Sequence, residues 1–94
     1  MWSHLWDRTV VFVQGDRVEL SLEGLMEPRI EPEIVFGIAA PLPSGDDPVE
    51  ILRAVAWIAP GFEIVHSPFP GWKFGAADCA AAYGLHGRLA VGVQ

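Results

Sequence analysis

Two glutamates, Glu31 and Glu33, stand two positions apart in a largely apolar run at residues 28–36. In a β-strand, alternate side chains point to the same face of the sheet, so both carboxylates are expected on one face. Like charges held side by side repel each other, and a bound cation relieves that repulsion. A third carboxylate, Glu63, stands in a similar run at residues 62–65. Three carboxylates with no cysteine nearby are typical of a site for Mg²⁺ or Mn²⁺. The alternative is a solvated pair on an edge strand.

The composition is apolar for so short a chain. Of the 94 residues, 51% are hydrophobic and 19% are charged, although a chain of this length buries only about 60–65% of its unfolded surface. We therefore expect one domain, residues 1–94, that belongs to a larger core or buries surface against a partner. The net charge is −6, with only six Lys plus Arg residues. The sequence thus lacks the basic patch that a nucleic-acid partner requires.

Several features bear on the cellular compartment. The single cysteine, Cys79, excludes an internal disulfide and fits a reducing cytosol, where it is expected to be a small buried thiol. The first residues lack the pattern of a signal peptide, and no apolar run reaches the ~18 residues that a membrane span needs. We therefore expect a cytoplasmic protein with no membrane partner.

Short apolar or alternating segments predict strands along most of the chain. The first two are joined by a short loop with a glycine, which predicts a hairpin. Pro32 lies inside the third and cannot donate a backbone hydrogen bond, so this strand is expected at a sheet edge, a strand start or a bulge. The predicted strands are residues 9–13, 17–22, 30–39, 62–66 and 88–93.

Two helices are predicted between these strands. The first begins at Pro48, with Asp47 as its N-cap and Glu50 closing a capping box. It is expected to continue to the Pro-Gly pair at residues 60–61, with a buried apolar stripe that includes Ile58. A shorter helix is predicted from Ala76 to Tyr83, stopped by Gly84. Together these elements indicate an α+β fold with one main helix.

Several motifs resemble a known family, the 2-keto-4-pentenoate hydratases and 4-oxalocrotonate decarboxylases of the fumarylacetoacetate hydrolase superfamily. The motifs occur in the family's order and cover nearly the whole chain. They are residues 5–10 (LWDRTV), 28–34 (PRIEPEI), 62–67 (FEIVHS), 71–74 (GWKF) and 77–78 (AD). The resemblance implies a partial mixed β-roll, the central part of a hydratase-like catalytic domain, because family members extend further on both sides.

The resemblance also implies roles for individual residues. Glu31, Glu33 and Glu63 match the family's ligands for Mg²⁺ or Mn²⁺. This ion is chelated by the carboxylate and the 2-oxo oxygen of the substrate, and it stabilises an enolate. Lys73 matches a basic position that holds a carboxylate or assists proton transfer, or else it is a surface lysine. Asp78 matches a nearby acidic position.

One motif of the family is absent. Where hydratases commonly have A-D-N-A-S, this chain has AAYGL at residues 81–85. His86 follows that stretch directly and is a candidate for lining the pocket as an acid or base. His66 is separated from Glu63 by an odd number of positions, so strand alternation places it on the opposite face, which favours a structural or surface role.

These observations predict a divalent-metal-dependent hydratase, a lyase acting on 2-oxo or 2-hydroxydienoate acids in aromatic-compound degradation. Two alternatives stay open. One is a related 4-oxalocrotonate-type decarboxylase. The other is a truncated, non-catalytic remnant that serves as a dimerising or partner-binding module, because an incomplete β-roll leaves edges and apolar surface exposed. The expected partners are a small 2-oxo acid and either further copies of the chain or the missing parts of the fold.

Overall fold

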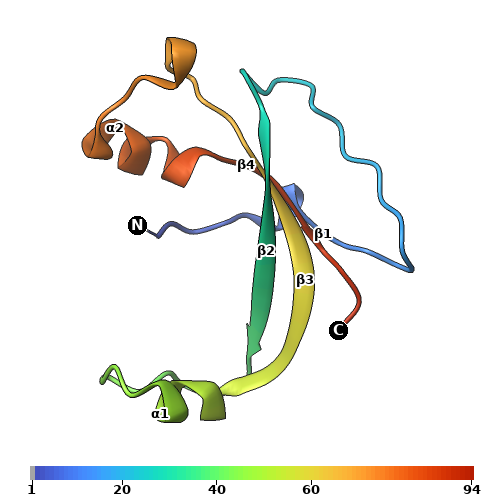
Figure 1. Ribbon diagram of the computed structural model, residues 1–94, viewed down its shortest axis with the longest axis vertical. Helices are drawn as coiled ribbons and strands as arrows, with labels where there is room; N and C mark the ends of the chain where they lie inside the picture. Colours follow the sequence, from blue (N-terminus) through green and yellow to red (C-terminus); the bar gives the residue numbers. More distant parts are fainter. Residues whose placement is uncertain (1) are drawn as a thin grey trace.

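The computed structural model describes residues 2–94 and contains a four-stranded mixed sheet with two short α-helices (Figure 1). The strand order is β1-β4-β3-β2. The strands are β1 (Val10–Phe12), β2 (Arg29–Ile38), β3 (Val55–Val65) and β4 (His86–Val91). β3 pairs antiparallel with both β2 and β4, whereas β1 pairs parallel with β4. The predicted α+β class is confirmed, and the superfamily's β-roll stays a prediction.

The helices are shorter than the sequence predicts. α1 spans Pro48–Arg53 and α2 spans Ala76–Ala81, while three single 3₁₀ turns occupy Asp7–Thr9 (η1), Pro70–Trp72 (η2) and Tyr83–Leu85 (η3). The predicted N-cap of α1 is confirmed, because the Asp47 side chain accepts a hydrogen bond of 2.9 Å from the Val49 backbone N–H. Glu50 pairs with Arg53 at the other end of the helix rather than closing a capping box.

The prediction that this helix continues to residue 59 is wrong. β3 begins at Val55, pairs with β2 over most of its length, and continues without interruption through Pro60 and Gly61. The carbonyl of Pro60 accepts a 2.8 Å hydrogen bond from Gly92. A Cβ at Gly61 would lie 2.7 Å from Val35 Cγ2, so this glycine permits close packing within the strand rather than ending an element. Pairing with β2 therefore overrides the local helical pattern.

The predicted hairpin near the N-terminus is also wrong. β1 pairs with β4, with Val10 opposite Leu89, and Val13 N–H donates to the Val91 carbonyl. Residues 17–22 lie within the described part of the chain and form no strand. The loop that contains them crosses the sheet face that carries Phe62, on the side away from the helices (Figure 1). Pairing with a distant strand has replaced the local hairpin.

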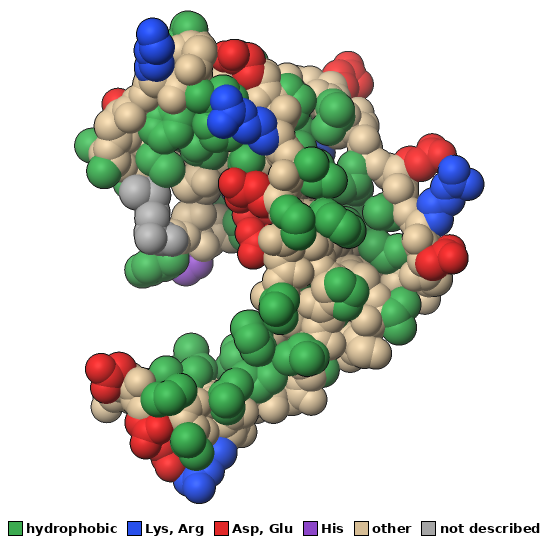
Figure 2. All heavy atoms as spheres, in the orientation of Figure 1, with side chains coloured by type: hydrophobic (Ala, Val, Ile, Leu, Met, Phe, Trp, Pro, Cys, Tyr) green, Lys and Arg blue, Asp and Glu red, His purple; other side chains and the backbone are tan. Residues whose placement is uncertain are grey.

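The two faces of the sheet differ in character. One carries the three glutamates of the EPE and FEIV motifs. The other carries large apolar side chains that are about half or more exposed, and Figure 2 shows hydrophobic side chains gathered over the β2–β3 pair. These exposed residues are Ile30, Ile34, Phe36, Ile58 and Phe62. We refer to them as the apolar face.

The molecule is open for its mass. Its accessible surface is 6978 Å², against about 5,300 Å² for a compact monomer of this size. Its radius of gyration is 15.0 Å, against about 12 Å for a compact chain of this length. The apolar face accounts for part of this excess, which is in line with the apolar composition. No helix within residues 2–94 is long and apolar enough to cross a membrane.

Candidate metal centre

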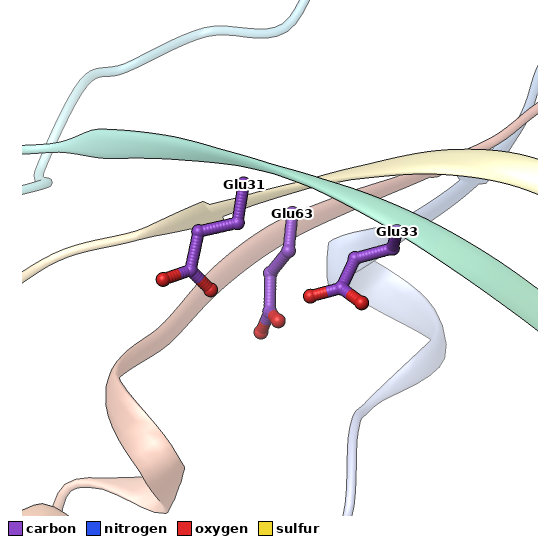
Figure 3. A group of neighbouring side chains, drawn as sticks. All are labelled: Glu31, Glu33 and Glu63. Atoms are coloured by element: carbon purple, nitrogen blue, oxygen red, sulfur yellow. The ribbon is translucent and has the colours of Figure 1, made fainter.

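Strand register brings the three predicted carboxylates together. Glu31 on β2 lies directly opposite Glu63 on β3, and Glu33 follows two positions later on the same face. One carboxylate oxygen from each residue lies within 4.8 Å of the other two. Figure 3 shows all three side chains pointing to the same side of the sheet, with Glu63 between the other two. The convergence expected from the sequence is therefore observed.

The space beside Glu33 is kept open by a glycine. Gly61 lies opposite Glu33 in the register, so no side chain from β3 occupies that position on the shared face. A Cβ built on Gly61 would stand 3.7 Å from Glu33 Cβ and collide with Val35. The glycine thus leaves the face free where the Glu33 carboxylate turns towards Glu63.

The three carboxylates fit a hard divalent cation. Oxygens bound to one Mg²⁺ at about 2.1 Å lie no more than about 4.2 Å apart, and those around Ca²⁺ lie up to about 5 Å apart. The observed separations, up to 4.8 Å, need only a small side-chain rotation to close on the smaller ion. Glu31 and Glu33 are exposed and can make that rotation. All the donors are carboxylate oxygens, which suits Mg²⁺ or Mn²⁺ better than a softer metal.

The electrostatics of the group favour a cation. Three carboxylates share a small volume, and within residues 2–94 none of them forms an ion pair with a lysine or arginine. The partner of Glu63 is His86, whose Nδ1 lies 2.8 Å from Glu63 Oε1. The charge on Glu31 and Glu33 is left without a protein partner in the described residues, and a bound cation would balance it.

His86 lies behind the glutamates rather than in an open pocket. Its side chain is only 6% exposed, and its Nε2 lies 2.8 Å from the Thr9 hydroxyl. The sequence predicts it as an acid or base lining the pocket. The structure places it against Glu63, where it contacts a candidate ligand through one nitrogen and a hydroxyl through the other.

Lys73 and Asp78 are not brought to the glutamates. Asp78 Oδ2 accepts a 2.9 Å hydrogen bond from Gly75 N–H and caps the start of α2. Lys73 is exposed and follows η2. Within residues 2–94 neither side chain forms a hydrogen bond or an ion pair with the three glutamates. Their catalytic roles stay predictions.

His66 has a structural contact, as its position in the sequence predicts. Its Nδ1 accepts a 3.2 Å hydrogen bond from the Met26 backbone N–H, which ties the long loop before β2 to the end of β3. Burial lowers the pKa of His66, and the nearby charges of Arg88 and His86 lower it further. Each of these causes disfavours the imidazolium form.

A hollow of about 280 Å³ opens beside Glu63. It is bounded by the N-terminal segment on one side and by α2 and η3 on the other. Its lining comprises Trp2, Ser3, Leu5, Glu63, Cys79, Tyr83 and Gly84. A larger hollow, about 590 Å³, lies on the opposite face next to Phe62 and has no contact with the glutamates. The smaller one is therefore the hollow relevant to the candidate metal centre.

Two of the four non-glycine residues with a positive φ in residues 2–94 lie at or beside one wall of this smaller hollow. Tyr83 and Leu85 adopt positive φ angles of 54° and 67°, on either side of Gly84 at 64°. Non-glycine residues in this region are uncommon and often mark functional sites. No local pattern in the sequence predicts this conformation for Tyr83. The nearest signal was the departure from A-D-N-A-S at the same place.

Comparison with known proteins places the chain among the enzymes that its motifs resemble. It is 36% identical over 84 residues to a 2-hydroxyhexa-2,4-dienoate hydratase of Comamonas testosteroni, a match that covers 88% of this chain and 32% of the relative. It is also 36% identical over 63 residues to a 4-oxalocrotonate decarboxylase of a Pseudomonas species, covering 67% of this chain and 25% of the relative. Over these stretches the chain belongs to the hydratase and decarboxylase family.

The shared stretch is only part of each relative. The chain spans about a third of the hydratase and a quarter of the decarboxylase that it matches. No family model matches the chain. The glutamates, the small hollow and the turn at Tyr83 thus lie in a segment that corresponds to part of each relative.

Proposed function

We propose that this chain carries the metal-binding part of a divalent-metal-dependent hydratase that acts on a 2-hydroxydienoate or the corresponding 2-oxo acid in aromatic-compound degradation. One observation carries the proposal. The oxygens of Glu31, Glu33 and Glu63 converge within 4.8 Å, in a chain that is 36% identical over 84 residues to a 2-hydroxyhexa-2,4-dienoate hydratase.

The three glutamates are the proposed ligands of a single Mg²⁺ or Mn²⁺ ion. Three protein ligands leave room in a six-coordinate shell for two oxygens of a 2-oxo acid and for water. When bound there, the ion would act as a Lewis acid towards those oxygens. Glu31 and Glu33 are exposed to solvent, from which a substrate would reach the ion, and the half-buried Glu63 borders the small hollow.

The small hollow is the proposed place for the hydrocarbon part of the substrate. At about 280 Å³ it is slightly smaller than the ~300–1,000 Å³ usual for drug-sized ligands, which suits a short-chain acid. Trp2, Leu5 and Tyr83 offer apolar surface, while Glu63 provides the polar end. This arrangement would orient a dienoate with its oxygens towards the glutamates and its chain away from water.

A decarboxylase is the second candidate, because the match to a 4-oxalocrotonate decarboxylase is as high in identity, though shorter. Both activities would use the same three glutamates and differ in what happens to the substrate carbon chain. Hydration adds water across a carbon–carbon double bond, whereas decarboxylation releases carbon dioxide. The product therefore distinguishes the two.

The test is an activity assay on metal-stripped protein with Mn²⁺ added back. We expect Mn²⁺-dependent loss of diene absorbance with 2-hydroxyhexa-2,4-dienoate, and no loss with Glu33→Gln. Carbon dioxide release from 4-oxalocrotonate would favour the decarboxylase instead. A matched control is Glu19→Gln, which removes the same charge from an exposed loop residue that is not one of the three glutamates. Absence of turnover of either acid by a chain that binds Mn²⁺ would contradict the enzymatic proposal and leave the metal site standing.

A further inference from the structure

A continuous chain of contacts connects Glu63 to the N-terminal segment. Glu63 Oε1 lies 2.8 Å from His86 Nδ1, and His86 Nε2 lies 2.8 Å from Thr9 Oγ1. Thr9 Oγ1 also lies 2.9 Å from the Trp6 carbonyl oxygen within the turn of η1, and its single hydrogen is donated either there or to Nε2 of His86. The three side chains come from η1, β3 and β4, so separate parts of the fold meet along one line.

These contacts bear on metal binding because they end at Glu63, a candidate ligand. A carboxylate only accepts hydrogen bonds, so the His86 ring donates from Nδ1 and fixes Oε1 of Glu63 in place. Oε2 has no hydrogen-bond partner within residues 2–94 and is free to meet an ion. The imidazole is 6% exposed, so water competes little for this contact.

The other two candidate ligands have no such support. Glu31 and Glu33 are exposed, and neither side chain has a hydrogen-bond partner in the described part of the chain. An exposed glutamate loses rotamer freedom when it binds an ion, whereas a glutamate already held in place loses less. Glu63 is therefore the candidate ligand whose side chain is already oriented in the absence of an ion. The side chains of Glu31 and Glu33 would have to reorient towards the ion when it binds.

We propose that His86 and Thr9 are positioning residues for the metal centre: His86 orients the Glu63 carboxylate towards Glu31 and Glu33, and Thr9 fixes the plane of the His86 ring. The inference rests on the metal-binding function proposed above and assigns residues that act through Glu63 rather than on the substrate. Hydrogen bonds from outer residues to metal ligands are typically worth about 10–100-fold in metal affinity.

Two matched pairs of variants test the proposal. His86→Leu removes the donor to Glu63, whereas His86→Asn places an amide N–H near the position of Nδ1. Thr9→Val removes the hydroxyl at nearly constant shape, whereas Thr9→Ser keeps it. We expect Mn²⁺ affinity to fall by about tenfold or more in His86→Leu, to fall less in Thr9→Val, and to recover in the Asn and Ser variants.

The measurement is calorimetric titration of each metal-stripped protein with Mn²⁺, after far-ultraviolet circular dichroism has shown that the variant is folded. A general loss of packing would lower affinity in both members of a pair, so the recovery in Asn and Ser separates positioning from structure. If His86→Leu does not fold, the half-buried Thr9 pair decides the question.

The outcomes are distinguishable. Wild-type binding with unchanged affinity in His86→Leu and Thr9→Val overturns the positioning roles and leaves the metal site intact. Wild-type protein that binds no Mn²⁺ overturns the metal site and the positioning roles together. Wild-type binding that weakens in Leu and Val and returns in Asn and Ser supports both.

Discussion

Removing one charge from the three glutamates should stabilise the metal-free protein and abolish its response to metal. In the absence of an ion, the Glu33 carboxylate faces two others within 4.8 Å. Each such pair repels by about 0.9 kcal/mol at the dielectric constant of water, and physiological salt roughly halves that figure. Glu33→Gln removes two pairs, so we expect a gain of about 1 kcal/mol.

The assay is thermal unfolding, first in a chelator and then in Mn²⁺. For a chain of this length, 1 kcal/mol corresponds to a rise in Tm of about 4–8 °C, so Glu33→Gln should melt above the wild type in the chelator. At about a hundredfold excess of Mn²⁺ over its Kd, a bound ion adds about 2.7 kcal/mol to the wild type and nothing to the variant. The order of the two melting temperatures should therefore reverse.

A control variant and a second ligand variant sharpen the test. Glu19→Gln removes the same negative charge from the chain, and its Tm should stay close to that of the wild type in both buffers. Glu63→Gln should not stabilise the metal-free protein as Glu33→Gln does, because it also weakens the contact with His86 at 2.8 Å. If Glu33→Gln melts below the wild type in chelator, or if Mn²⁺ raises the Tm of both proteins equally, then the carboxylates do not form a shared cation site.

Three further expectations follow from the fold. Because folding lowers the pKa of His66, the unfolded chain protonates this imidazole more readily than the folded chain does. The contribution of the neutral His66 side chain to the free energy of unfolding is therefore fully present above about pH 6.5 and is lost as the pH falls below that value. The free energy of unfolding of His66→Gln, measured in urea, should depend less steeply on pH than that of the wild type. An unchanged pH dependence would contradict the lowered pKa of His66. Gly61→Ala should cost about 1–3 kcal/mol in urea unfolding, because its Cβ would stand 2.7 Å from Val35 Cγ2; a neutral result would show that β2 and β3 separate easily. Analytical ultracentrifugation should show that the wild type self-associates and that Ile34→Glu weakens this association, since Ile34 is 68% exposed on the apolar face. A monomeric wild type would show that the apolar face does not mediate self-association.

Part of the candidate site could be predicted because it depends on local geometry. The two-residue period of a strand is enough to put Glu31 and Glu33 on one face. Pro32 predicted a sheet edge, a strand start or a bulge, and the first of these is confirmed, since β2 is the outer strand of the sheet. Asp47 likewise predicted the start of α1, because an N-cap acts within the first turn.

The rest depends on contacts between distant residues. The end of α1 could not be predicted, because Val55 joins β3 through its pairing with β2, and the sequence around it is compatible with both states. Glu63 reaches Glu31 through a register that local patterns do not encode. Thr9 and His86 are 77 positions apart, and no periodicity connects them. The signals near Thr9 were the motif at residues 5–10 and the strand predicted at residues 9–13, and neither assigned a role to its hydroxyl.

Glu31, Glu33 and Glu63 are proposed to form one divalent-cation site. Calorimetric titration of the metal-stripped chain with Mn²⁺ measures binding at this site without depending on substrate or turnover. We predict saturable binding of one ion per chain, lost in Glu33→Gln and retained in Glu19→Gln. Absence of binding by the wild type, or equal binding by Glu33→Gln, would contradict the claim.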